Sequence, residues 1–239
     1  KLETQRDGMG IFSYTPISGK NVASATVNYK GKEYSFPLPT ALPAGYAMSV
    51  YDASGAMLIS VGCNSNTPED DMAVFISKDG RPYAYQAFHS QKDKPQSFLI
   101  KTRDFPGGVY QITLLNKNGQ TLCERFYFIQ PKDKLSMTVS GTHSVYLPYK
   151  PIHCEVQVTD KGGKPLQGTF SIAVRDAVRS DYAEYDNNLF TDMLLTSDLK
   201  GYIHQPGYYF TNVTSQKLQE LDLVMMIHGW RQYDMSTLI

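Results

Sequence analysis

The stretch GVYQITLLNKNGQTLCERFYFI, residues 108–129, decides the fold of this chain. It consists of two runs rich in β-branched and aromatic residues, 108–115 and 121–129, on either side of Lys117-Asn118-Gly119. Such runs favour strands, and Asn and Gly tolerate the positive φ angles of a tight turn. The stretch therefore predicts two strands joined by a turn.

The same pattern extends toward the N-terminus and predicts a series of short strands. We expect the strands at residues 46–51, 57–61, 72–77, 81–88, 96–101, 108–115 and 121–129. Further turns are expected at Ala53-Ser54-Gly55 and Lys78-Asp79-Gly80. Short strands at a spacing of roughly ten residues are typical of an immunoglobulin-like sandwich. We assign this predicted domain to residues 44–132.

The residues before this domain predict a separate pair of strands. Residues 21–29 alternate apolar and polar side chains, and residues 33–38 repeat the alternation after the turn Lys30-Gly31-Lys32. Prolines cannot donate the hydrogen bonds of a sheet, and three of them follow closely, at positions 37, 39 and 43. We therefore expect a domain boundary at about residues 40–44.

The residues after Pro131 predict further strands and then two helices. Strands are expected at 136–139, 152–159 and 168–176, and amphipathic helices at 187–199 and 215–230. The predicted face of the first helix carries Leu189, Phe190, Met193 and Leu194, and that of the second carries Leu218, Leu221, Val224, Met225 and His228. Ser215 is the expected N-cap of the second helix, and Gly229 is expected at its left-handed C-terminus.

The predicted fold class is thus mainly β, with tandem immunoglobulin-like antiparallel sandwiches and two short helices in the C-terminal domain. That domain covers residues 133–239, with the helical part at about 187–230. The first residue is Lys1, not Met, and we expect the chain to be part of a longer protein.

Charge and hydropathy argue against several classes of partner. The 239 residues contain 23 Lys plus Arg and 23 Asp plus Glu, with no block of like charge. This balance does not indicate binding to nucleic acid or to an anionic membrane surface. No apolar stretch approaches the roughly 20 residues that cross a bilayer.

The sequence does not contain a recognisable catalytic or metal-binding motif. Cys63, Cys123 and Cys154 lack the paired spacing of a zinc site. They could be free buried thiols, or one disulfide, such as Cys63 with Cys123, could leave one thiol over. Neither a nucleophile elbow nor a phosphate-binding loop is present, and the five dispersed histidines are expected to be surface or interface residues. We expect no enzymatic activity and no cofactor.

Two clusters could bind a ligand. Carboxylates gather at residues 69–71 and 181–187 and could hold calcium, although a solvated loop or a helix cap accounts for them better. An aromatic cluster could stack on sugars or bind a partner protein, or it could bury the helices against the sandwich. Its members are Tyr182, Tyr185, Tyr202, Tyr208, Tyr209 and Phe210.

Seven stretches of the chain form a recognisable set, and the most specific is LLTSDLKGYI at residues 194–203. The others are GMGIFSYTP at 8–16, FPLP at 36–39, NGQTLCERFYF at 118–128, PGYYF at 206–210, LDLVM at 221–225 and HGWRQY at 228–233. Together they resemble the macroglobulin-type (MG2-like) sandwich domains that precede the plug of TonB-dependent receptors in outer-membrane proteins of Bacteroidetes.

The resemblance implies a cell-envelope location, periplasmic or associated with the outer membrane. It implies that residues 1–43 are the last strands of a preceding, incomplete macroglobulin-like domain, and that further receptor domains follow residue 239. The thioester motif Cys-Gly-Glu-Gln of protease-trapping macroglobulins is absent, since Asn64, Glu124 and Glu155 follow the three cysteines. We therefore expect a non-catalytic scaffold whose partners are neighbouring domains, an envelope protein or a glycan. The alternative is a carbohydrate- or peptide-binding module that uses Tyr182, Tyr185, Tyr208, Tyr209 and Phe210.

Overall fold

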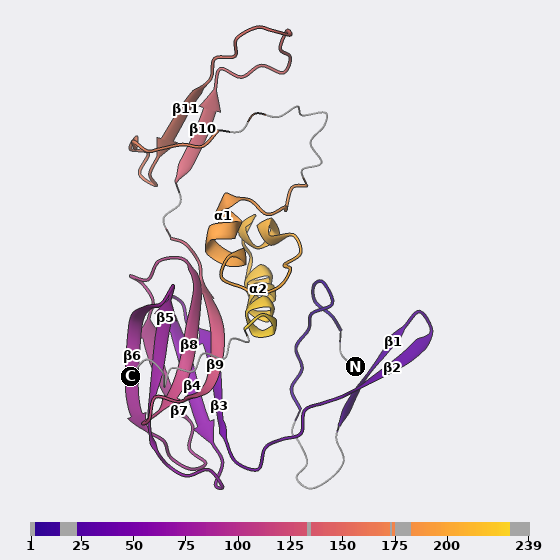
Figure 1. The fold of residues 1–239 in the computed structure, drawn as a ribbon, viewed down its shortest axis with the longest axis vertical. Coiled ribbons are helices and arrows are strands. Elements are labelled where there is room, and N and C mark those ends of the chain that lie inside the picture. The colour runs from indigo at the N-terminus through magenta and orange to yellow at the C-terminus, as the bar shows by residue number, and fades with distance from the viewer. Residues whose placement is uncertain (1–2, 15–22, 133–134, 173, 175–182, 230–239) are drawn as a thin grey trace.

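A computed structural model describes residues 3–14, 23–132, 135–172, 174 and 183–229 of the chain. The described part is mainly antiparallel β structure with a small helical unit, as the sequence predicted (Figure 1). Two sheets make up its centre. One contains β3 (Tyr46–Asp52), β4 (Ala56–Cys63) and β7 (Gln96–Lys101), and the other contains β5 (Asp71–Lys78), β6 (Arg81–His89), β8 (Gly108–Asn116) and β9 (Thr121–Ile129).

The strand orders are β3-β4-β7 and β6-β5-β8-β9, and every neighbouring pair is antiparallel. All the strands predicted between residues 46 and 129 are present, with ends shifted by a residue or two. The predicted turns are also confirmed. At the β5 to β6 turn, for example, Asp79 and Gly80 have φ angles of 52° and 73°. A left-handed backbone at both positions suits the twist of a two-residue hairpin, which explains why Asp and Gly occur there.

The two sheets pack face to face around an apolar core. Alternate residues of each strand point inward, so Ile59 of one sheet and Ile76 and Ile112 of the other are completely buried. The hydroxyl group of Tyr110 in the same core donates to the carbonyl oxygen of Pro106 at 2.9 Å. This sandwich-like arrangement is the rigid centre from which the other elements extend.

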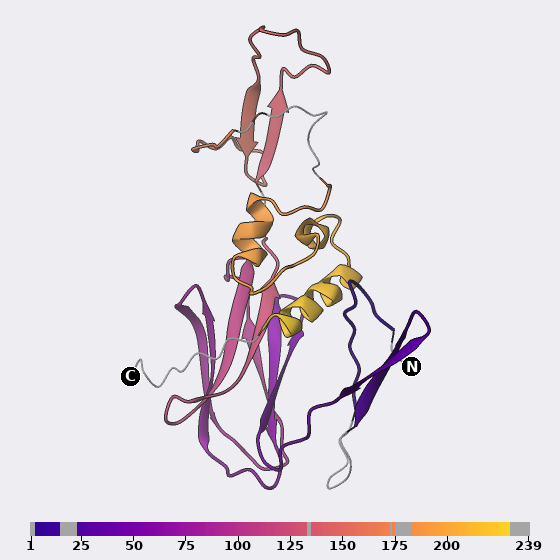
Figure 2. The ribbon, with the colours of Figure 1, turned by 45° about the vertical axis from the view of Figure 1, so that its right-hand side comes forward.

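A second apolar core lies on the outer face of β8 and β9, against a helical unit formed by residues 183–229 (Figure 2). The unit contains α1 (Leu189–Thr191), the π-helical turn η2 (Asp192–Thr196), the 3-10 helix η3 (Pro206–Phe210) and α2 (Ser215–Ile227). Phe126 of β9 is buried against this unit, whereas the next residue, Tyr127, is buried in the sandwich. Strand β9 is therefore covered on both faces.

The helices differ in detail from the prediction. In the first, Leu195 and Leu199 are buried, whereas Leu189 and Met193 are 72% and 65% exposed. The prediction assumed a regular α-helix, but the π-helical turn changes the register of the side chains and so rotates the buried face.

The ends of α2 also differ from the prediction. Its N-cap is Thr214, whose hydroxyl oxygen accepts from the backbone N–H of Lys217 at 3.3 Å, and Ser215 is the first helical residue. Gly229 does not have the predicted positive φ. A side chain there would meet the carbonyl oxygen of Met225 at 2.7 Å, so a close approach of the backbone explains the glycine.

Two hairpins stand apart from the sandwich in both views (Figures 1 and 2). The first pairs β1 (Ser24–Tyr29) with β2 (Lys32–Pro37), close to the predicted bounds, although residues 21 and 22 lie outside the described part. The second pairs β10 (Ser136–Ser140) with β11 (Glu155–Thr159), so residues 152–154 are not part of the strand predicted there.

The predicted strand at 168–176 does not form over its described residues, 168–172 and 174. Its apolar side chains Ile172 and Val174 are 71% and 84% exposed, because no described strand lies beside them to pair with or to cover them. The described part of residues 133–239 thus contains a two-stranded sheet and the helical unit, and a second sandwich there stays a prediction.

Candidate functional site

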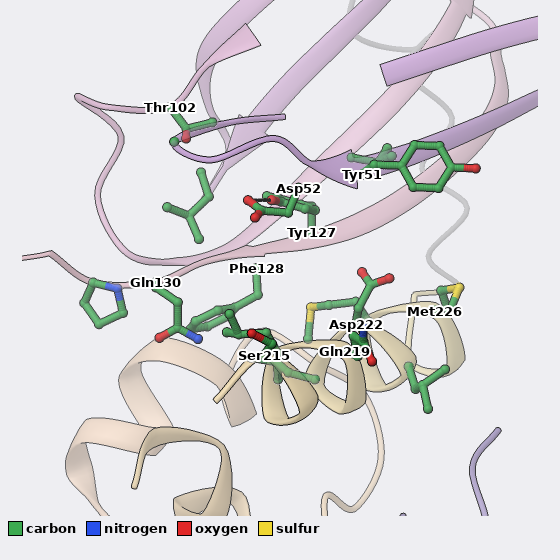
Figure 3. A pocket seen from close by; sticks show the side chains of 18 of the residues that line it. Tyr51, Asp52, Thr102, Tyr127, Phe128, Gln130, Ser215, Gln219, Asp222 and Met226 are labelled. Carbon is green, nitrogen blue, oxygen red and sulfur yellow. Dashed lines mark hydrogen bonds between the residues drawn. The ribbon is translucent and has the colours of Figure 1, made fainter. Parts of the chain in front are cut away.

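A groove of about 780 Å³ separates α2 from the edge of the sandwich (Figure 3). Val50, Tyr51 and Asp52 of β3 line one wall, together with residues at the end of β9. Leu218 and Asp222 of α2 line the opposite wall, with other side chains of that helix. A volume of this size is in the usual range for ligand sites. We refer to this space as the α2 groove.

Arg125 connects the two walls of the α2 groove. Its Nη2 atom lies 2.6 Å from Oδ2 of Asp222, and its Nη1 atom donates to the carbonyl oxygen of Val50 at 2.6 Å. Burial raises the pKa of Asp222, and the guanidinium of Arg125 acts in the opposite direction without cancelling the effect of burial. The guanidinium of Arg125 on β9 thus binds both β3 and α2. Asp222, its partner on α2, is also a lining residue of the groove.

A second carboxylate, Asp52, lies on the strand side of the groove, and Asp222 points from α2 toward the sandwich (Figure 3). Oδ1 of Asp52 accepts from the hydroxyl group of Tyr127 at 3.1 Å. Burial raises the pKa of Tyr127, as do Asp52 and, more weakly, Asp222. The α2 groove thus has apolar surfaces and one carboxylate on each wall.

Two polar side chains that line the groove, Lys132 and Gln130, differ in their hydrogen bonding. Lys132 is turned to the backbone, where its Nζ atom donates to the carbonyl oxygens of Thr102 and Arg103, at 2.8 Å each. Gln130 also lines the groove, and its Nε2 atom is buried without a hydrogen-bond partner among the described residues. An unsatisfied amide donor is costly to bury, so it marks a place where a ligand acceptor would be stabilised.

The predicted aromatic patch lies elsewhere, in the helical unit. Tyr209 is 1% exposed and belongs to the second core, Tyr185, Tyr208 and Phe210 are half-buried, and Tyr182 lies outside the described residues. Tyr202, which the sequence grouped with them, is 81% exposed and contacts His204 instead. The rings of Tyr208 and Tyr209 meet edge to face with centroids 5.4 Å apart, a packing arrangement common in protein interiors.

Tyr208 contacts two cationic side chains and a buried carboxylate. The guanidinium carbon of Arg6 lies 3.5 Å from the centroid of its ring, and Nζ of Lys217 lies 4.1 Å from it. Its hydroxyl group donates to Oε2 of Glu220 at 2.9 Å, and Glu220 is 1% exposed. Burial and the bond to Glu220 raise the pKa of Tyr208, whereas Arg6 opposes the shift. These contacts attach the N-terminal segment, residues 3–14, to the helical unit.

The predicted carboxylate clusters do not converge on a metal site in the described part of the chain. No group of three or more His, Cys, Asp or Glu side chains there could hold a metal ion. Asp70 pairs with Lys117 at 3.2 Å and Asp71 with His89 at 2.8 Å. The hydrogen bond that His89 donates to Asp71 raises the pKa of His89. Asp186 accepts from the backbone N–H of Ala183, and residues 181 and 182 lie outside the described part.

The cysteines and most histidines lie apart from the groove. Cys63, Cys123 and Cys154 are free thiols, so the possible Cys63 to Cys123 disulfide does not form, and Cys154 is exposed. Burial raises the pKa of Cys123 to about 11. His228 contacts the carbonyl oxygen of Lys200 through Nδ1 at 2.6 Å, a structural role at the end of α2.

Comparison with known proteins adds no identification. Neither a protein-family model nor a curated protein sequence matches the chain. Within the described residues, every helix is too short or too polar to span a bilayer.

Sequence reasoning did not predict the α2 groove. One signal was available in the run Phe126-Tyr127-Phe128-Ile129, which is apolar without alternation, because such a run indicates a strand that is buried on both faces. The pairing of Arg125 with Asp222, 97 positions apart in the chain, has no local signature.

Proposed function

We propose that the chain is a non-catalytic scaffold and interaction region of a larger cell-envelope protein. The resemblance to macroglobulin-type domains suggests tandem immunoglobulin-like sandwiches, a periplasmic or outer-membrane location and association with a TonB-dependent receptor. Under this proposal the partners are neighbouring domains of the same polypeptide and proteins or glycans of the envelope. The sandwich-like body, predicted as residues 44–132, would be one module of such an array.

The observation that carries the proposal is the exposure of apolar side chains on both hairpins. On the β1–β2 hairpin, Val27 pairs with Tyr34 across the strands, and these side chains are 50% and 40% exposed. On the β10–β11 hairpin, Met137 and Val139 are 63% and 49% exposed. Contiguous exposed apolar surface marks interaction sites, and an isolated two-stranded hairpin is marginally stable in water. Each hairpin would therefore be stabilised by joining a neighbouring module.

The rigid centre supports the same proposal. One apolar core holds the two sheets together, and the second core and the Arg125 bridge hold the sandwich and the helical unit together. Such a body can separate two interaction sites, which is the mechanical task of a spacer.

The alternative, a carbohydrate- or peptide-binding module built on the aromatic patch, has weaker support. A stacking platform needs accessible ring faces. Tyr209 is in the core, and the faces of Tyr208 are flanked by Arg6 and Lys217.

Site-specific photo-crosslinking in the source cells tests the scaffold proposal. A benzophenone amino acid replaces Phe36 or Met137 on the hairpins, and Tyr85, which is 65% exposed on β6, serves as the matched control. We expect the two hairpin positions to crosslink to envelope proteins or to flanking parts of the same polypeptide, and Tyr85 to crosslink much less. Equal crosslinking at all three positions, or a product confined to cytoplasmic proteins, would contradict the proposal.

A further inference from the structure

We infer that the α2 groove binds an extended peptide segment in which a basic side chain is flanked by apolar side chains. This site is distinct from the apolar hairpins and goes beyond the scaffold proposal. The inference rests on three features of the groove: the free edge of β3, the carboxylates on opposite walls and the unsatisfied amide of Gln130.

The free edge of β3 supplies backbone hydrogen-bonding groups. β3 has β4 as its neighbour on one side and is the last strand of its sheet. The backbone N–H of Ala53 donates to Ala56 at the turn into β4, so odd-numbered residues of β3 face β4 and even-numbered ones face the free edge. The carbonyl group of Val50 accordingly points outward to Arg125. Val50 itself is only 3% exposed, so the backbone groups that remain available to an added strand, as in β-augmentation, are the N–H and C=O of Asp52.

The charges of the groove select a basic side chain. Asp52 and Asp222 each use one carboxylate oxygen, for Tyr127 and Arg125 respectively, and no described residue forms a hydrogen bond or ion pair with the second oxygen. The single lysine of the lining, Lys132, is turned to the backbone of residues 102 and 103. A basic side chain that enters the groove can therefore pair with the free oxygen of Asp52, on the wall opposite the Arg125–Asp222 pair.

The apolar residues of the lining favour apolar side chains on either side of the basic residue of the peptide. Ile11, Leu218 and Met226 line the groove and are at least partly exposed, and methionine adapts to side chains of different shape. Successive side chains of a strand alternate in direction, so apolar residues two positions from the basic one would contact this lining. Gln130 lies toward one end of the groove, where its amide could donate to a peptide carbonyl.

Binding of synthetic peptides to the full 239-residue chain tests the inference. The probe is a capped peptide as long as β3, seven residues, with the sequence Thr-Val-Thr-Lys-Thr-Val-Thr, which places valine two positions from the central lysine on either side. Isothermal titration calorimetry compares it with the same peptide carrying a central glutamate. We expect the lysine peptide to bind about fivefold to tenfold more tightly, the ratio that one charge-assisted contact gives. Equal affinities, or no binding of either peptide, would overturn the inference.

Two variants locate the site. Asp52→Asn can still accept from Tyr127 and should reduce the affinity for the lysine peptide by about fivefold, whereas Asp52→Lys should reverse the preference in favour of the glutamate peptide. The matched control is Glu33→Gln, which removes an exposed carboxylate on β2 and should change neither affinity. Circular dichroism melting verifies that each variant is folded. Unchanged binding in Asp52→Asn and an unchanged preference in Asp52→Lys would contradict the assignment.

Backbone pairing separates a peptide site from a site for small amines. N-methylation of alternate amides removes the donors of the probe, and we expect it to weaken binding at least tenfold and to abolish the shift of the Asp52 amide signal in NMR spectra. If the methylated peptide and n-octylamine bind as tightly as the lysine peptide, the groove recognises an apolar amine and the peptide assignment is wrong.

Discussion

Nη2 of Arg125 lies 2.6 Å from Oδ2 of Asp222, so a guanidinium from the sandwich is paired with a carboxylate of α2. The Arg125 side chain is 14% exposed and the Asp222 side chain 38%. A partly buried pair of this kind is costly to break by removing one partner, even where forming it gains little. Because Arg125 is the more buried partner and also binds Val50, its loss should lower the free energy of unfolding more than the loss of Asp222.

Replacing Arg125 by Met should destabilise the protein more than replacing Asp222 by Asn. Arg125→Met loses the hydrogen bond to Val50 and leaves Asp222 unpaired, and because water reaches Asp222 we expect a cost of about 1–2 kcal/mol. Asp222→Asn keeps an acceptor for Arg125 and should cost less than about 1 kcal/mol. Urea unfolding of both variants measures the difference. A larger loss in Asp222→Asn would contradict the described geometry.

The stability of the protein should depend on the ionisation of Asp222. Its folded-state pKa is raised, mainly by burial, so the folded state holds the proton more tightly than the unfolded state does. The contribution of Asp222 is therefore fully present below the ordinary Asp pKa of about 3.9 and is lost as the pH rises through the folded-state value. Unfolding free energies of the parent chain minus those of Asp222→Asn, measured across this window, should fall with rising pH. A rising difference would mean that Arg125 outweighs burial.

Substitution of two tyrosines of the helical unit, Tyr209 and Tyr202, tests which of them contributes to the core. Tyr209→Ala should cost about 3–5 kcal/mol, because it empties a side-chain volume in the second core, where Tyr209 is 1% exposed. The matched substitution Tyr202→Ala should change the unfolding free energy by no more than about 0.5 kcal/mol, since Tyr202 is 81% exposed. Thermal and urea unfolding provide both values. Similar effects of the two substitutions would contradict the assignment of Tyr209 to the core.

The bond between Tyr208 and the buried carboxylate of Glu220 should stabilise the helical unit. Tyr208→Phe keeps the ring between Arg6 and Lys217 but removes a donor to Glu220, and we expect a loss of about 1–3 kcal/mol. The double variant with Glu220→Gln should recover part of this loss, because a neutral amide is less costly to bury without the tyrosine. Full additivity of the two substitutions in a double-mutant cycle would show that the contact is not made.

The sandwich-like body could be predicted from the sequence because its signals are local. The strands between residues 46 and 129 are short runs rich in β-branched and aromatic residues, and the turns at 53–55 and 78–80 contain residues suited to positive φ angles. The helix of residues 215–227 was also predictable from its apolar spacing. Its N-cap was misassigned by one position because Thr214 and Ser215 are both good caps.

The α2 groove could not be predicted, because it depends on contacts between distant parts of the chain. Arg125, Val50 and Asp222 come together only when the helical unit packs on β9. The aromatic cluster illustrates the same limit, since sequence alone could not separate the core residue Tyr209 from the exposed Tyr202. The π-helical turn of residues 192–196 similarly changes which leucines are buried.

Native-state hydrogen exchange tests the central claim, that the helical unit and the sandwich form one body through the outer face of β9. We predict that the amides of α2 are protected to a similar degree as those of β9, and that Phe126→Ala lowers the protection of α2 by at least tenfold, because it removes a buried contact between them. Rapid exchange throughout α2 while β9 stays protected, in the parent chain, would contradict the claim.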